Sequence, residues 1–95
     1  MPLDLILCDV SAPMVREWRR AFLEFSDVDV SHGSILDIAA DAYVSPANSF
    51  GIMDGGIDAL FSARFPHVEG RVQTAISTLG RPLAVGECVI VEVCP

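Results

Sequence analysis

Residues 41–58 read DAYVSPANSFGIMDGGID, and the fold prediction rests mainly on this stretch. The apolar residues 42–44 predict a buried strand, which ends at Pro46 because proline cannot continue a central ladder. Residues 47–56 contain three glycines and one asparagine, a composition that predicts a loop. A helix is then predicted to begin near Gly56 or Ile57 and to end before Pro66. A buried strand, a glycine-rich loop and a helix therefore follow one another.

The residues that precede this stretch predict a strand, a helix and a second strand. Residues 3–10 form a nearly continuous apolar run, typical of a strand covered on both faces. A helix capped by Ser11 is predicted to run to about Phe25, with Val15 at the edge of its apolar stripe. The centre of that stripe is predicted to hold Met14, Trp18, Ala21, Phe22 and Phe25. Residues 28–30 predict a short strand, His32 a turn or strand position, and residues 34–38 a loop or short strand.

The residues that follow it predict a second helix and a last strand. The helix covers residues 68–79 and is ended by Gly80, with Pro82 beyond it. The run 88–93, Cys-Val-Ile-Val-Glu-Val, predicts the strand. The resulting order, β-α-β-(β)-β-α-α-β, predicts an α/β layered fold built as one small domain.

The charge composition excludes several classes of function. The 95 residues carry a net charge of −7, and a strongly acidic domain repels phosphate backbones, so general nucleic-acid binding is not expected. All six basic residues are arginine, which excludes a Schiff-base lysine and a Walker lysine. No apolar run approaches the roughly 18 residues of a membrane span, and no membrane partner is predicted.

The cysteines, histidines and first residues predict a cytoplasmic protein without a metal or cofactor. Three cysteines (Cys8, Cys88 and Cys94) form no C-x-x-C pair, which favours buried, reduced thiols. The two histidines, His32 and His67, are distant from each other and from the cysteines, so no metal site is predicted. The first residues lack the basic segment of a signal peptide.

The glycine-rich loop is the candidate site for chemistry. A strand that leads through such a loop into a helix presents free N–H groups and the positive end of the helix dipole, which suits phosphate. Gly55 and Gly56 would let a pyrophosphate approach the backbone, although a plain turn has the same composition. Asn48, at the carboxyl end of the predicted strand, suits a ribose diol. Asp58 is either a catalytic carboxylate or a simple complement to the helix dipole.

Residues 41–49 together with Gly55-Gly56-Ile57-Asp58 resemble the signature of the macro domain family. In that family a strand ending in D-A-I-V-N-A-A-N leads to a glycine-rich loop and then to V-D at a helix start. Here the spacing from Asn48 to Asp58 is the same. Residues 33–36 lie where the family carries G-D-I-T, and residues 86–90 resemble its G-E-A-V-I-T segment. The resemblance extends over residues 28–93.

The resemblance implies a three-layer α/β/α sandwich with a mixed sheet that binds ADP-ribose or ADP-ribosylated protein. Asn48, with Ala47 beside it, would contact the distal ribose, and Asp58 would activate or position the attacking water. The remaining ligand-binding positions implied by the family are the phosphate-facing Gly55, Gly56 and Ile57 and the adenine-facing Ser34 and Ile35. The reaction implied is removal of ADP-ribose from protein side chains or deacetylation of O-acetyl-ADP-ribose.

Three departures from the family leave three functions open. Ser34 stands where the family has an adenine-reading aspartate, and Asp54 brings a negative charge to the phosphate loop. The family's second glycine-rich loop would lie beyond residue 95, so we expect residues 1–95 to be one incomplete macro-like domain, truncated at its C-terminus. An unpaired sheet edge would then favour self-association. The candidate functions are a hydrolase, a non-catalytic ADP-ribose-binding module, and an inactive fragment.

Overall fold

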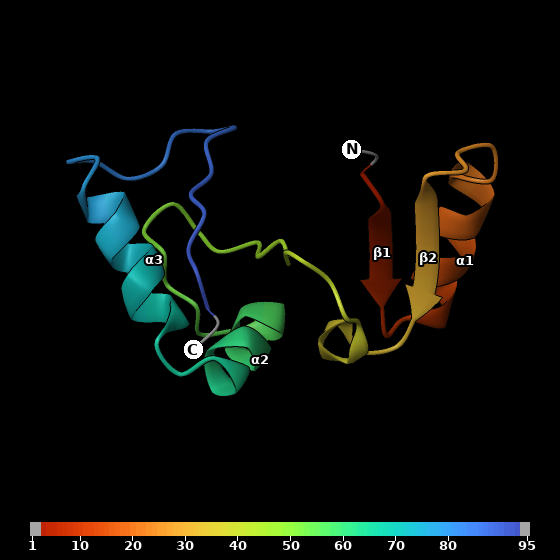
Figure 1. Ribbon diagram of the computed structural model, residues 1–95, viewed down its shortest axis with the longest axis horizontal. Helices are drawn as coiled ribbons and strands as arrows, with labels where there is room; N and C mark the ends of the chain where they lie inside the picture. Colours follow the sequence, from red (N-terminus) through yellow and green to blue (C-terminus); the bar gives the residue numbers. More distant parts are fainter. Residues whose placement is uncertain (1–2, 94–95) are drawn as a thin grey trace. The chain divides into compact units, whose positions relative to one another are not determined.

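The computed structural model describes residues 3–93, which belong to two compact units, Met1–Asp41 and Ala42–Pro95. Within the described residues there are three α-helices and a single sheet of two strands (Figure 1). The chain is therefore a small mixed α/β protein, which confirms the predicted α/β class at that level.

The first unit is a parallel β-α-β arrangement. Strand β1 (Leu5–Asp9) pairs in parallel with β2 (Val28–His32), and helix α1 (Ala12–Ala21) connects them (Figure 1). The register places Leu5 opposite Val28 and Asp9 opposite His32. Parallel strands require such a crossover, and an amphipathic helix provides it while covering apolar side chains of the sheet.

Helix α1 begins as the sequence predicts and ends earlier. Ser11 is the N-cap, and its Oγ accepts a hydrogen bond from the Met14 N–H at 3.4 Å. The helix ends at Ala21 rather than near Phe25, because two successive tight turns bring the chain back to β2. Val15, predicted at the edge of the apolar stripe, is 2% exposed and is the most deeply buried side chain of this unit. Of the predicted centre of the stripe, Trp18 and Phe22 are half-buried, whereas the prediction is wrong for the exposed Met14, Ala21 and Phe25.

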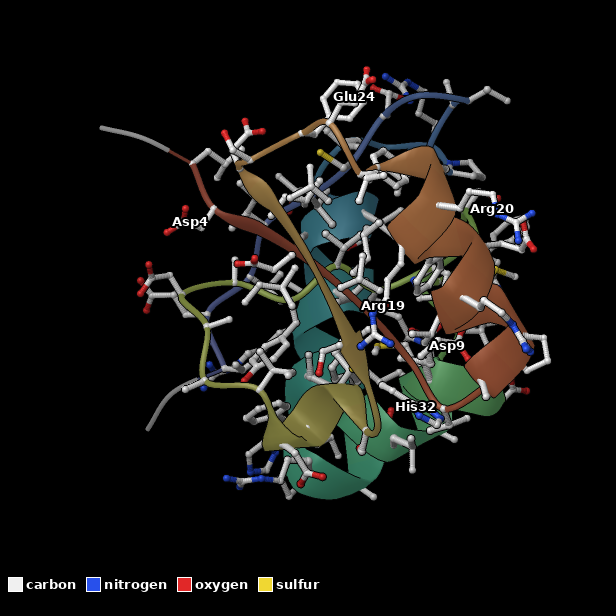
Figure 2. All side chains as sticks on the ribbon, turned by 90° about the vertical axis from the view of Figure 1, so that its right-hand side faces the viewer. Asp4, Asp9, Arg19, Arg20, Glu24 and His32 are labelled. Atoms are coloured by element: carbon white, nitrogen blue, oxygen red, sulfur yellow. The ribbon has the colours of Figure 1, made fainter. Side chains whose placement is uncertain are left out.

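Polar residues gather at the carboxyl end of the two strands. Figure 2 shows Asp9 and His32 at one end of the sheet and Asp4 at the other. Asp9 accepts a hydrogen bond from the Ser11 N–H at 2.7 Å, and the His32 Nε2 lies 3.1 Å from the Val10 carbonyl oxygen. His32 is the last residue of β2, as one of its two predicted positions allowed. A short 3-10 helix, η1 (Ile35–Asp37), replaces the loop or strand predicted for 34–38.

The second unit contains two helices and long irregular segments. Helix α2 (Gly56–Arg64) confirms the predicted helix start, and α3 (Val68–Ser77) ends two residues before the predicted Leu79. Gly80 adopts φ +74, the left-handed conformation expected of a residue that follows a helix. The core of this unit consists of Met53, Phe61, Val68 and Ile76, each at most 6% exposed. Tyr43 packs on Phe61, with ring centroids 5.9 Å apart.

Two predicted strands do not form. Residues 42–44 and 88–93 are irregular, and Val44 and Ile90 are 83% and 94% exposed. Strand formation requires a neighbour that takes up the backbone hydrogen bonds, and in residues 3–93 the only paired strands are β1 and β2. The predicted burial of the cysteines fails for the same reason at Cys88, which is exposed. Cys8 is half-buried, and Cys94 lies outside the described residues.

Candidate functional site

Asn48 organises the first half of the glycine-rich loop. Its side-chain oxygen accepts hydrogen bonds from the N–H groups of Phe50 (3.0 Å) and Ile52 (3.2 Å). Its backbone carbonyl accepts a third hydrogen bond, from the Gly51 N–H at 3.0 Å. Asparagine is suited to this task because its short amide can replace backbone partners in a turn. The side chain that the sequence assigns to a ribose therefore holds its own loop, although the residue remains exposed.

The middle of the loop is fixed against helix α3. Gly51 is buried at φ +77, and a Cβ built there would lie 3.0 Å from Val72 Cγ1 and 3.1 Å from Ile76 Cδ1. The Met53 N–H donates to Glu69 Oε2 at 2.6 Å, and the Gln73 amide donates to the Gly51 carbonyl at 3.3 Å. Only glycine meets both the conformational and the steric demand at residue 51. The loop is thereby held in one conformation.

The end of the loop presents open backbone at the start of α2. Gly55 is the N-cap residue, and no side chain caps the helix there. Gly55 and Gly56 are exposed, and nothing lies within 4 Å of a Cβ built on either. Ile57 follows in the first turn with 36% exposure. The first N–H groups of a helix have no intrahelical acceptor, so this position can offer donors to an anion.

Asp58 is buried and has a specific partner. Its side chain is in the first turn of α2 and is 6% exposed. The Ser45 hydroxyl donates a short hydrogen bond to Asp58 Oδ1 and accepts one from the Ala47 N–H at 3.2 Å. A buried carboxylate is costly unless it is hydrogen-bonded, and Ser45 provides that bond. Asp58 is therefore more than an exposed complement to the helix dipole.

Ser45 is the residue that sequence reasoning missed. It links Asp58 to the segment that leads into the loop, because its hydroxyl also contacts Ala47. The sequence showed Ser45 only as a replacement for the first asparagine of the family motif. A polar residue at the end of an apolar run, before a proline, was the available signal.

The predicted site residues fall into two groups. The second unit contains half-buried Ala47, buried Asp58 and the exposed residues Asn48, Gly55, Gly56 and Ile57. Ser45 ties the segment before Asn48 to Asp58. Ser34 and Ile35 belong to the first unit, where both are half-buried and the Ser34 hydroxyl accepts from the Leu36 N–H at 3.3 Å. Their assignment to an adenine contact stays a prediction.

The Arg81–Glu87 ion pair of the second unit lies outside this loop. The Arg81 guanidinium hydrogen-bonds both carboxylate oxygens of Glu87, and the Ala84 N–H donates to one of them. These hydrogen bonds lower the pKa of Glu87 to about 2, and the bond from Arg81 has the larger effect.

Residues 3–93 contain no group of three histidine, cysteine or acidic side chains placed to hold a metal ion. In the same residues, no helix is long and apolar enough to cross a membrane.

Comparison with known protein families, curated proteins and solved structures finds no match to this chain. The resemblance to the macro domain signature therefore rests on the residues of the chain alone.

Proposed function

We propose that the chain binds ADP-ribose, free or attached to protein, through the loop 47–57. The observation that carries the proposal is the open, uncapped backbone of Gly55 and Gly56 at the start of α2. A pyrophosphate placed there would meet N–H donors and the positive end of the helix dipole. The three-layer α/β/α sandwich of macro domains is the fold proposed with this function.

The rest of the loop supports the proposal by being fixed before any ligand arrives. Asn48 holds residues 50–52, while Glu69 and Gln73 hold residues 53 and 51. A loop already held in one conformation loses less entropy when a ligand binds. Asp54 opposes binding because it is exposed and brings a negative charge close to the phosphate position. Asp54→Asn should therefore strengthen binding.

Hydrolysis is the second step of the proposal, with Asp58 activating or positioning water against the distal ribose. A carboxylate in that role contributes roughly 10²–10⁴ in rate. The alternative is a module that binds without turnover, and the hydrogen bond from Ser45 to the buried Asp58 favours it, because one carboxylate oxygen is already engaged.

The binding proposal is tested at Gly55. Gly55 has φ −146, which any residue adopts, so Gly55→Asp should fold and cap α2 with its own carboxylate. That carboxylate would occupy the phosphate position, and we expect ADP-ribose affinity to fall by about tenfold or more. Gly55→Asn is the matched neutral control, and its ADP-ribose affinity should fall less than that of Gly55→Asp. Thermal melts with ADP-ribose, and with AMP as the control ligand, measure the effect. Equal ADP-ribose binding by wild type and Gly55→Asp would contradict the proposed site.

The catalytic step is tested at Asp58 with an ADP-ribosylated peptide. Asp58→Asn keeps an oxygen for the Ser45 hydroxyl and removes the charge, so folding and binding should survive while turnover is lost. Retained turnover in Asp58→Asn would exclude the catalytic role of Asp58. Binding without turnover in the wild-type chain would identify a binding module. A wild-type chain with no cooperative melt and no response to ADP-ribose would identify the inactive fragment.

A further inference from the structure

A hollow lies at the junction of helices α2 and α3, and no residue of the loop 47–57 lines it. It has a volume of about 530 Å³, and its lining includes Arg64, Phe65, His67, Arg71 and Val93. A second hollow of about 500 Å³ adjoins it and shares Pro66, His67 and Arg71. Sites for small molecules in proteins typically have volumes of about 300–1,000 Å³. The space is therefore large enough for an organic ligand rather than an ion alone.

The lining of this hollow is cationic within an acidic chain. Two of the three arginines of residues 42–95 and one of the two histidines of the protein line it, and no acidic side chain lines either hollow. Three acidic side chains of the same unit have hydrogen-bond donors elsewhere. Asp58 accepts from Ser45, Glu69 from the Met53 N–H, and Glu87 from Arg81. The positive charge of the hollow is thus not neutralised by its own lining.

Each guanidinium group contacts a neighbouring residue, and both arginines are exposed to solvent. Arg64 Cζ lies 5.4 Å from the centroid of the Phe65 ring, a cation–π contact. The Arg71 Nη1 donates a hydrogen bond to the Glu92 carbonyl. Each contact uses only part of the donor capacity of its guanidinium, which carries five N–H donors. The planar guanidinium groups therefore keep N–H donors that can reach an oxyanion.

We infer that this hollow binds a small organic phosphate monoester. The terminal phosphate has three acceptor oxygens and close to two negative charges at neutral pH, which match Arg64, Arg71 and His67. The organic part would lie against Phe65, Pro66 and Val93. A carboxylate offers two oxygens and one charge and fits this donor set less well. The site is separate from the loop 47–57, and ADP-ribose has no terminal phosphate to occupy it.

The inference is tested by two-dimensional NMR titration of the whole chain with phenyl phosphate, inorganic phosphate and benzoate. We expect saturable shifts at His67 and at the side-chain Nε–H groups of Arg64 and Arg71. Phenyl phosphate should bind with a Kd at or below about 1 mM, tighter than inorganic phosphate or benzoate. Equal affinity for phenyl phosphate and inorganic phosphate would mean that free phosphate is the ligand and would overturn the organic part of the inference.

Charge-matched variants decide the location of the site. Arg64→Met and Arg71→Met should each weaken phenyl phosphate binding by about tenfold, the value of one lost hydrogen bond to a charged group. Arg16→Met, at an exposed position of α1, changes the net charge by the same amount and should leave the Kd for phenyl phosphate within about twofold of wild type. Because Arg71→Met also removes the bond to Glu92, Arg64→Met, which keeps that bond, is the decisive variant.

Three results would overturn the inference. Shifts that do not saturate would show nonspecific screening. An equal loss of affinity in Arg16→Met would show an effect of net charge. Shifts concentrated at residues 55–57 would place the phosphate at the loop proposed for ADP-ribose. Failure of the ADP-ribose proposal would leave the result at Arg64 unchanged, because the two experiments use different residues and ligands.

Discussion

The two units of the chain treat similar apolar runs differently. In the first unit, residues 5–9 and 28–32 pair as parallel strands and a helix packs on them (Figure 1). In the second unit, residues 42–44 and 88–93 are as apolar but stay irregular. Residues of high β propensity therefore form a strand only where another strand takes up their hydrogen bonds, because unpaired N–H and C=O groups keep water as their partner.

The units also differ in how they use charge. Residues 1–41 hold eight acidic residues and three arginines, whereas residues 42–95 hold five acidic residues and three arginines. In the second unit, three of the five carboxylates accept hydrogen bonds that fix loops or helix starts. The less acidic unit therefore contains both anion sites proposed above.

Trp18 and Tyr43, the single tryptophan and the single tyrosine, report on the first and second units separately.

The largest effect on stability is expected from a large-to-small substitution in the core of the second unit. Phe61 is 4% exposed and packs on Tyr43, so Phe61→Ala should lower the free energy of unfolding of this unit by about 4 kcal/mol. Chemical denaturation followed by Tyr43 and by Trp18 measures the two units. We expect the Tyr43 transition to move and the Trp18 transition to stay.

The matched control is Phe50→Ala, since Phe50 is 62% exposed in the same unit. Phe50→Ala should lower the free energy of unfolding by under about 1 kcal/mol, as is usual for surface substitutions. Equal movement of the Trp18 and Tyr43 transitions in Phe61→Ala would show that the two units unfold as one, and the comparison would then fail.

A smaller loss is expected at the buried glycine of the loop. Gly51→Ala combines a positive φ with close contacts to Val72 and Ile76 and should cost about 3 kcal/mol. Gly56→Ala is the control, because its φ is +56 but nothing lies near its Cβ, and it should cost about 1 kcal/mol. Thermal melts compare the two. Similar losses would mean that α3 does not constrain the loop.

A loss confined to the first unit is expected at its helix cap. Ser11→Ala removes the acceptor of the Met14 N–H and should cost about 1 kcal/mol, detected by Trp18 fluorescence. Ser77→Ala, near the exposed end of α3, is the control and should change stability little, since alanine favours helices. A Tyr43 transition that moves with Ser11→Ala would indicate coupling between the units.

The smallest effect concerns the Arg81–Glu87 pair. Hydrogen bonds from Arg81 and from the Ala84 N–H lower the pKa of Glu87 from 4.5 to about 2. Because the folded-state pKa is the lower one, the stabilisation is fully present above pH 4.5 and is lost as the pH falls toward 2. The difference in melting temperature between wild type and Glu87→Gln should shrink over that range. A constant difference would contradict the role of the charge.

Local features were predictable where the determinant lies within a few residues. The Ser11 cap and the helix start at Gly56 depend on neighbouring residues and are confirmed. The positions of the strands failed at 42–44 and 88–93 because pairing depends on partners distant in sequence. The site was predictable in part. The loop and the helix start are present, whereas the Ser45–Asp58 contact and the role of Asn48 inside the loop were not foreseen.

The mixed α/β class, the C-terminal end of the glycine-rich loop and the helix that follows it were predictable from the sequence alone. These follow from periodicity, caps and glycine, which act over one or two turns of chain. Three features depend on tertiary packing: Val15 is buried, Ser45 donates to Asp58, and one hollow without a carboxylate is lined by Arg64, His67 and Arg71. These features depend on contacts between residues that are distant in sequence. Such contacts determine burial and charge pairing, and the local sequence pattern does not.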